Sequence, residues 1–122
     1  MTAANVINGL AYVMLGADDI DRSVEFYRVI LGLDLSNRFE DFAFWNTGAT
    51  TLAVSGELSR RRTTTEREPV ELVFSVGSVT AAYDALKARV AFVNEPRQVN
   101  EANWAVNFTD PDGHALSLYG PR

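Results

Sequence analysis

Glu71 is the residue whose surroundings most require a chemical explanation. It lies in the segment VELVFSV, where its neighbours Val70 and Leu72 to Phe74 are all apolar. A buried carboxylate costs free energy unless it is paired, hydrogen-bonded or hydrated. Three interpretations remain open: a structural glutamate at an edge or bonded to the hydroxyl of Tyr12, an anchor for a cationic or hydroxyl-bearing ligand, and a general base in a metal-free reaction.

The sharpest short motif is Asp110-Pro111-Asp112-Gly113. Proline fixes φ, aspartates bond to nearby backbone N–H groups and glycine supplies a positive φ, so the motif predicts a hairpin turn between the last two strands. It resembles part of a calcium loop, but the downstream oxygen ligands are missing. The single histidine, His114, stands three positions before Ser117, which on a strand points it to the opposite face. We expect it to be an exposed polar residue.

Composition limits the classes of protein to which the chain can belong. Its 122 residues are 47% apolar and contain no cysteine, which predicts one compact domain without disulfides or a thiolate metal site. No apolar run approaches the roughly 20 residues that span a bilayer. The first residues lack the pattern of a secretory signal, so we expect a cytoplasmic protein. The net charge of −5 argues against a nucleic acid as partner.

The first half contains a strand followed by a capped helix. Leu10 to Leu15 has strong β character, and Asp19 is placed to accept hydrogen bonds from the first turn of a helix. Gly32 is placed to end that helix. The helix is predicted from one apolar stripe, Ile20, Val24, Tyr27 and Leu31.

Two further strands are predicted in the first half, at Phe39 to Thr47 and Thr50 to Val54. The polar stretch Glu57 to Glu68 has no periodicity and is predicted to be a solvated loop, with 59–65 linking the two halves.

The second half repeats this order of elements. A strand at Val70 to Val76 precedes a helix that Ser78 can cap, with Val79, Ala82, Tyr83 and Leu86 on one face. A shift of 59 residues superposes most apolar positions of the first strand and helix on apolar positions of the second. Three more strands are predicted, at Val90 to Val93, Trp104 to Phe108 and Ala115 to Tyr119. We therefore predict an α+β fold of two βαβββ modules.

The segments DIDRSVEFYRVILGL and NFTDPDGHALSLYGP resemble the vicinal oxygen chelate superfamily, which includes glyoxalases, bleomycin resistance proteins and extradiol dioxygenases. The resemblance covers essentially the whole chain. It implies two modules, 1–58 and 66–122, whose strands form a curved mixed sheet around a cleft. Many members are homodimers, some with the cleft shared between chains, so we expect a homodimer.

In that superfamily, function depends on four strand positions that face the cleft. Here the resemblance places Tyr12, Ala53, Glu71 and Ser117 at them. Metal-dependent members carry His, Glu or Gln there, whereas among these four residues of this chain only Glu71 is a good metal donor. We therefore expect neither a metal nor another cofactor.

The expected function is metal-independent binding of a small molecule, as in bleomycin resistance proteins. An aromatic or cationic ligand would be sequestered in a cleft with aromatic walls. The alternative is a lyase or dioxygenase of glyoxalase type with a displaced metal set that includes Glu57. A degenerate member acting as a subunit or regulator also remains open. For Trp45 and Trp104, core packing is the competing interpretation. The expected ligand-binding residues are Tyr12, Trp45, Ala53, Glu71, Trp104, Ser117 and Tyr119.

Overall fold

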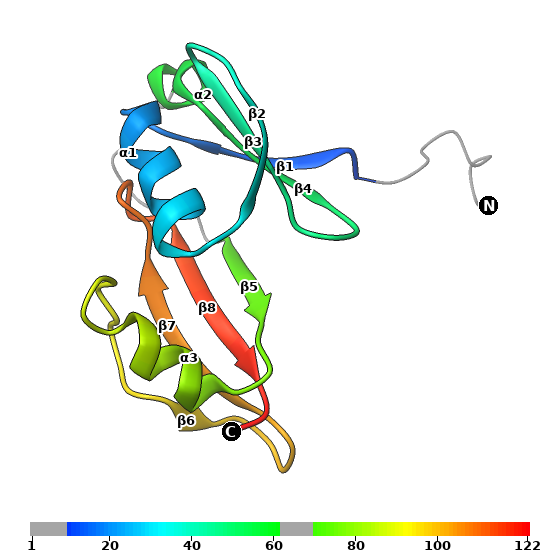
Figure 1. The fold of residues 1–122 in the computed structure, drawn as a ribbon, viewed down its shortest axis with the longest axis vertical. Helices are drawn as coiled ribbons and strands as arrows, with labels where there is room; N and C mark the ends of the chain where they lie inside the picture. The colour runs from blue at the N-terminus through cyan, green and yellow to red at the C-terminus, as the bar shows by residue number, and fades with distance from the viewer. Residues whose placement is uncertain (1–9, 62–69) are drawn as a thin grey trace, which may run out of the picture.

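The chain forms two four-stranded mixed sheets (Figure 1). We describe residues 10–61 and 70–122 of a computed structural model. The first sheet has the order β1-β4-β3-β2 and the second the order β5-β8-β7-β6. In each sheet the first strand runs parallel to the last, and the other pairs are antiparallel. The strands are β1 Tyr12–Gly16, β2 Asp34–Arg38, β3 Phe42–Asn46, β4 Thr51–Ser55, β5 Glu71–Ser75, β6 Arg97–Gln98, β7 Trp104–Thr109 and β8 Ala115–Gly120. The predicted α+β class is confirmed.

The first helix begins and ends where its sequence predicts. The Asp19 side chain accepts a hydrogen bond from the backbone N–H of Arg22, and α1 spans Ile20–Val24. The helix then widens into a π-helical segment, η1, Glu25–Ile30, in which Leu31 N–H donates to the carbonyl of Phe26. Gly32 follows with φ of 74°, a conformation that favours glycine.

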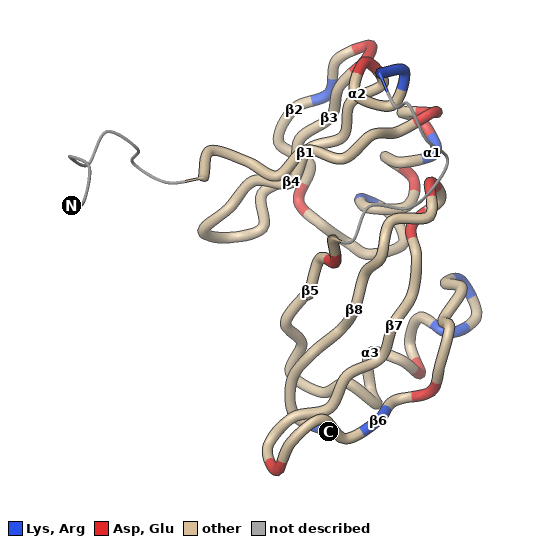
Figure 2. Tube along the Cα trace, turned by 180° about the vertical axis from the view of Figure 1, so that it is seen from behind, with Lys and Arg blue, Asp and Glu red and all other residues tan. Residues whose placement is uncertain are grey.

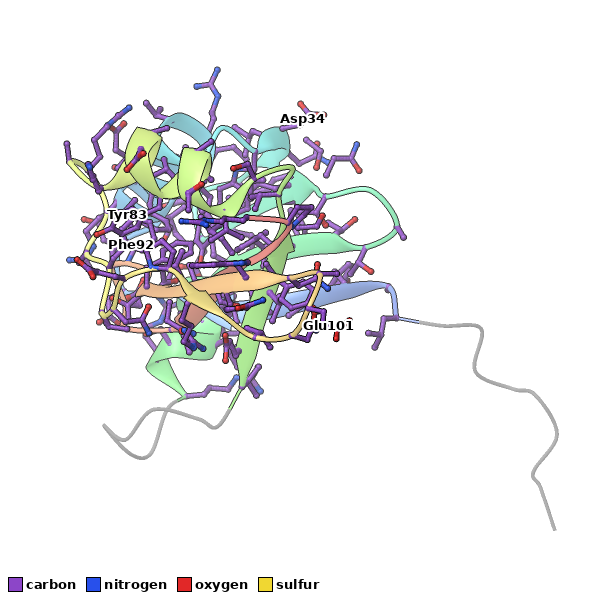
Figure 3. The ribbon with its side chains drawn as sticks, turned by 90° about the horizontal axis from the view of Figure 1, so that it is seen from below. Asp34, Tyr83, Phe92 and Glu101 are labelled. Carbon is purple, nitrogen blue, oxygen red and sulfur yellow. The ribbon has the colours of Figure 1, made fainter. Side chains whose placement is uncertain are left out.

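The second helix is also capped as predicted. The Ser78 hydroxyl accepts from the backbone N–H of Ala81, and α3 spans Val79–Leu86. Tyr83 of α3 packs against Phe92, with ring centroids 4.8 Å apart (Figure 3).

Two strand predictions differ from the structure. Strand β2 went unpredicted because its sequence, DLSNR, is polar and its side chains are mostly exposed. The strand predicted at Val90 to Val93 is wrong, because only Phe92 makes a single β-bridge there, to Phe108. The fourth strand of the second sheet is instead β6, which pairs with β7.

The predicted loop from Glu57 is wrong at its start. Gly56–Arg60 form a short helix, α2, whose N-terminus is capped by the hydroxyl of Ser55. The rest of that predicted loop, from 62 onward, lies outside the described residues.

One hydrophobic core lies under the helix-covered faces of both sheets. It combines Trp45 and Leu52 of the first sheet with Phe108 and Leu116 of the second. Phe26 of η1 reaches the second sheet, 6.4 Å from the ring centre of Phe108. Charged residues gather in the helices, turns and strand ends, whereas β8 and β7 carry none (Figure 2). Within 10–61 and 70–122, no helix has the length and apolarity needed to cross a membrane.

Candidate functional site

The first strand of each sheet has one edge without a strand partner in the described chain. β1 pairs only with β4, and β5 only with β8. Two grooves lie between these edges, and Val13 and Leu72 line both. The larger groove, about 580 Å³, extends to α2 and His114. The smaller groove, about 390 Å³, contains Glu71 in its wall. The junction of the two sheets is therefore hollowed at two adjoining places.

Tyr12 and Ala53 lie on the face of the first sheet opposite the helix, which we call its open face. The register pairs Tyr12 with Thr51 and Met14 with Ala53, so these side chains alternate with the core residues Leu52 and Val54. Tyr12 is 50% exposed, and its ring meets Phe44 edge to face at 5.7 Å. Ala53 itself is fully buried. The open face of this sheet therefore presents aromatic rings around a small, covered residue.

Glu71 lies on the corresponding open face of the second sheet, where it is exposed to solvent. Its Oε1 accepts a 3.1 Å hydrogen bond from Nδ2 of Asn107, on β7. Strand β8 lies between β5 and β7, so the Glu71 side chain reaches across a whole strand. The short side chains of Ala115 and Ser117 leave room for this crossing. Glu71 is therefore fixed by an amide and not by the hydroxyl of Tyr12, which makes no hydrogen bond within the described ranges.

Ser117 and Tyr119 share this open face. Ser117 pairs with Val73 on one side and Asn107 on the other, and it is only 3% exposed. The hydroxyl of Tyr119, two residues further along β8, accepts a hydrogen bond of 3.3 Å from Nδ2 of Asn100. The two residues thus form part of one polar surface with Glu71.

The two tryptophans do not lie on the open faces with the other predicted ligand-binding residues. Trp45 pairs with the core residue Leu52, is fully buried and packs against Tyr27 at 5.2 Å. On β7, Trp104 and Val106 point to the face opposite that of Asn107. Trp104 packs there against the core, to which Val106 belongs. The guanidinium of Arg122 lies over its ring at 4.8 Å. Their period-two positions place both on the faces that the helices cover.

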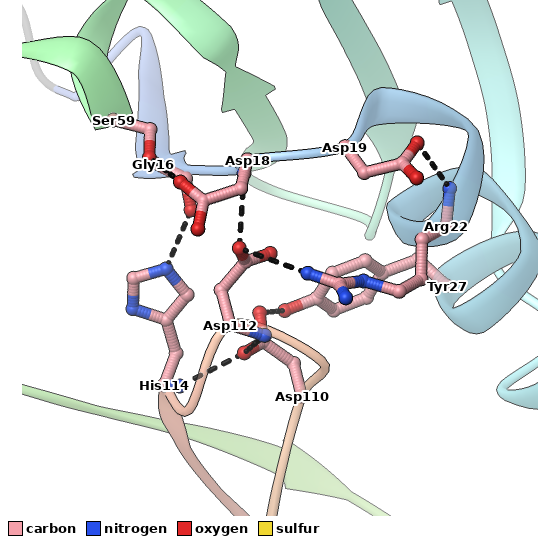
Figure 4. A network of polar contacts seen from close by, with 9 residues as sticks. All are labelled: Gly16, Asp18, Asp19, Arg22, Tyr27, Ser59, Asp110, Asp112 and His114. Atoms are coloured by element: carbon pink, nitrogen blue, oxygen red, sulfur yellow. Dashed lines mark hydrogen bonds and ion pairs between the residues drawn. The ribbon is translucent and has the colours of Figure 1, made fainter.

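A second polar cluster joins the two halves at the turn between β7 and β8 (Figure 4). Asp110 is buried and accepts hydrogen bonds from the backbone N–H groups of Asp112 and His114, which confirms the predicted turn. The hydroxyl of Tyr27 donates to Asp110 Oδ2 at 2.7 Å. Burial raises the pKa of Tyr27, and the negative charge of Asp110 adds to the effect. Burial also raises the pKa of Asp110, while the hydrogen bond from Tyr27 opposes that shift.

His114 belongs to this cluster, and the expectation of an exposed residue is wrong. Its side chain is partly buried, and its Nε2 lies 2.7 Å from the carbonyl oxygen of Gly16, at the end of β1. Only a protonated nitrogen can bond a carbonyl, so Nε2 carries a hydrogen. The backbone N–H of Asp18 likewise donates to Asp112 Oδ1 at 2.9 Å. These bonds hold β1 and the first helix to the hairpin, and no local signal in the sequence connects residues so far apart.

The residues at the four positions that the resemblance assigns to the cleft do not fit a metal ion. Alanine offers no donor, and the neutral hydroxyls of Tyr12 and Ser117 are weak ligands. No group of three or more His, Asp or Glu side chains suited to a metal occurs in 10–61 or 70–122. Glu57 lies in helix α2, so the strand alternation that placed it on the face of Ala53 does not apply.

Comparison with known proteins agrees with this architecture. The profile of the glyoxalase/bleomycin resistance protein/dioxygenase superfamily matches residues 9–118. The chain belongs to this superfamily. Among curated relatives it is 29% identical to the metallothiol transferase FosB of Staphylococcus haemolyticus over 117 residues, which are 93% of this chain and 84% of the relative. Its identity to the metallothiol transferase FosB of Shouchella clausii is 25% over 118 residues, covering 93% and 81% of the two chains.

Solved structures show the same fold. A glyoxalase/bleomycin resistance protein/dioxygenase from Nocardioides superposes with a TM-score of 0.76 at 24% identity, covering 97% of this chain and 86% of that one. A glyoxalase-related enzyme from Fulvimarina pelagi gives a TM-score of 0.78 at 20% identity and covers 93% and 88%. These similarities show the fold alone, so the site residues must decide the function.

Proposed function

We propose that this superfamily member binds a small aromatic ligand with a cationic or hydroxyl-bearing end, and sequesters it without a metal. One observation carries the proposal: of the four cleft positions, only the one held by Glu71 has an ionisable carboxylate, and that carboxylate is oriented by an amide. A single exposed carboxylate beside a groove suits an ammonium or hydroxyl group better than it suits a metal.

The ligand-binding surface that we propose consists of Tyr12 on the first sheet and Glu71 and Tyr119 on the second, with the buried residues Ala53 and Ser117 beneath it. Tyr12 and Tyr119 supply ring surface, and aromatic rings both bury apolar area and attract cations. The smaller groove leads to Glu71 between the two sheet edges. This set omits the two tryptophans, because Trp45 is buried in the core and Trp104 is partly buried against it, on the face opposite the open face.

A thermal-shift screen tests the proposal. Glycopeptide antibiotics, aromatic amines and divalent ions are added separately to the wild-type protein, to Glu71→Gln and to Glu101→Gln. Glu101 is an exposed carboxylate at the β6–β7 connection (Figure 3), so its substitution controls for a general loss of negative charge. We expect an aromatic amine to stabilise the wild type and Glu101→Gln, and to stabilise Glu71→Gln less.

The competing function is a metal-dependent enzyme, which the similarity to the metallothiol transferase FosB favours. Elemental analysis of the purified protein separates the two functions. About one equivalent of zinc, nickel or iron per chain, lost in Glu71→Gln, would contradict metal-independent binding.

We also propose that the protein is a homodimer that covers the free edges of β1 and β5. Large hydrophobic side chains are exposed beside these edges: Leu10 at 76% and Val70 at 56%. An unpaired edge with apolar side chains is a template for association. Light scattering should give twice the 13.5 kDa mass of one chain. We expect Val70→Lys to shift the mass toward the monomer, and Val93→Lys, at an exposed valine away from these edges, to leave it unchanged.

A further inference from the structure

A chain of hydrogen bonds links two opposite charges across the open face of the second sheet. Oδ1 of Asn107 accepts from Nη1 of Arg97 at 2.6 Å, and Nδ2 of Asn107 donates to Oε1 of Glu71 at 3.1 Å. The amide is therefore held with its donor end at the carboxylate and its acceptor end at the guanidinium. Nδ2 of Asn94 also donates to Oδ1 of Asn107 at 3.0 Å, which reinforces this orientation, and Oδ1 of Asn94 accepts from the backbone N–H of Asn107 at 2.9 Å.

Both charged groups keep unused hydrogen-bonding capacity. Oε2 of Glu71 and the remaining guanidinium N–H groups of Arg97 make no hydrogen bond within 10–61 and 70–122. Both side chains are exposed. A carboxylate can accept several hydrogen bonds, and a guanidinium carries five N–H donors. Glu71 and Arg97 can therefore offer an acceptor and a donor to a ligand while both keep their hydrogen bonds to Asn107.

The spacing of the two charges allows one small head group to contact both. One amide joins hydrogen bonds of 2.6 and 3.1 Å, so the bonded atoms of Arg97 and Glu71 are at most about 8 Å apart. With hydrogen bonds of about 2.8 Å to each partner, a ligand whose two charged atoms are roughly 2–4 Å apart can reach both groups. That is the separation between the ammonium nitrogen and the carboxylate oxygens of an α-amino acid.

An apolar surface adjoins the charged pair on the same face. Val73 pairs with Ser117 and is 58% exposed, and Tyr119 lies two positions further along β8. Neither side chain belongs to the core. Together they can support a flat ring extending from the charged end.

We propose that this face binds an aromatic α-amino acid, or a molecule with the same head group. Its ammonium group would donate to Glu71, its carboxylate would accept from Arg97, and its ring would lie on Val73 and Tyr119. The inference rests on the proposed function for the role of Glu71 and the aromatic surface. It adds Arg97 as a determinant of specificity, so that the ligand is dipolar and not simply cationic.

Calorimetric titration with three indoles tests this inference: L-tryptophan carries both charges, tryptamine only the ammonium, and indole-3-propionate only the carboxylate. We expect the wild type to bind tryptophan most tightly. Arg97→Gln should weaken tryptophan and indole-3-propionate roughly five- to tenfold and leave tryptamine unchanged. Glu71→Gln should weaken tryptophan and tryptamine instead. Arg89→Gln and Glu101→Gln remove exposed charges elsewhere and should change none of the three, with melting temperatures showing that all variants fold.

Equal affinity for tryptamine and tryptophan, with tryptophan binding unaffected by Arg97→Gln, would overturn the dipolar head group while leaving the proposed function in place. The same conclusion follows if no indole binds but another aromatic amine binds in a manner that requires Glu71. If no aromatic molecule binds at all, both the inference and the proposed function are wrong.

Discussion

The hydroxyl of Tyr27 donates a 2.7 Å hydrogen bond to the carboxylate of Asp110, and the two residues are 83 positions apart in the sequence. Tyr27 lies in η1 and Asp110 in the turn between β7 and β8, so the bond joins the helix of the first half to the second sheet. A charged acceptor strengthens such a bond, and burial makes its loss costly.

Removing this hydroxyl should destabilise the protein. Tyr27→Phe keeps the ring but leaves a buried oxygen of Asp110 without its donor, so we expect the free energy of unfolding to fall by about 1–3 kcal/mol in urea denaturation. Tyr83→Phe is the matched control, because the Tyr83 hydroxyl makes no hydrogen bond in the described parts of the chain. Equal effects of the two substitutions would show that the bond contributes nothing.

Alkaline pH should weaken the same contact. The pKa of Tyr27 is raised in the folded protein by burial and by Asp110, so above the ordinary value of 10.0 the unfolded chain loses this proton first. The folded state then binds more protons than the unfolded state, and stability falls as pH rises. We expect the melting temperature of the wild type to fall more steeply between pH 9 and 11 than that of Tyr27→Phe, as measured by circular dichroism. Parallel curves would contradict this assignment.

Gly120 should tolerate no side chain. A Cβ atom there would lie 2.3 Å from the carbonyl oxygen of Val76, where the ends of β5 and β8 meet. We expect Gly120→Ala to reduce the free energy of unfolding by about 1–3 kcal/mol, because backbone must move to relieve the clash. At Gly77 a Cβ would have no neighbour within 4 Å, so Gly77→Ala is the control and should change stability little. Chemical denaturation measures both, and similar losses would disprove the steric explanation.

A second carboxylate beside Glu71 should be unfavourable. Ser117 is nearly buried beneath the path of the Glu71 side chain. We expect Ser117→Glu to lose about 1–3 kcal/mol of stability at pH 7, and to lose less near pH 4, where one carboxyl group is protonated. Ser117→Gln has the same size without the charge, so its loss should not depend on pH in this range. A pH-independent difference between the two variants would show that the two carboxylates do not interact.

The sequence predicts those features of the fold that depend on local chemistry. Asp19, Ser78 and Gly32 mark the helix ends through hydrogen bonds or backbone angles within a few residues of themselves, and the structure confirms all three. The turn at Asp110 follows from the same kind of local bonding. Strand β2 could not be found this way, because an exposed strand with polar side chains has no apolar alternation.

The side-chain environments at the site depend on contacts that the sequence does not contain. Whether Trp45 faces the core or the open face follows from its pairing with Leu52, and that register requires the assembled sheet. The bond between Glu71 and Asn107 spans 36 residues and crosses an intervening strand. Sequence analysis could single out Glu71 as unusual, but it could identify neither its partner nor Arg97 as the opposite charge.

The residue of the second repeat that corresponds to Tyr27 cannot form the bond that Tyr27 makes with Asp110. The shift of 59 that relates the two repeats carries Tyr27 onto Leu86, a residue without a hydroxyl. Donor and acceptor therefore come one from each repeat, and two copies of the second repeat would lack the donor. The joint between the halves is asymmetric, so each half depends on a side chain that its own sequence does not supply.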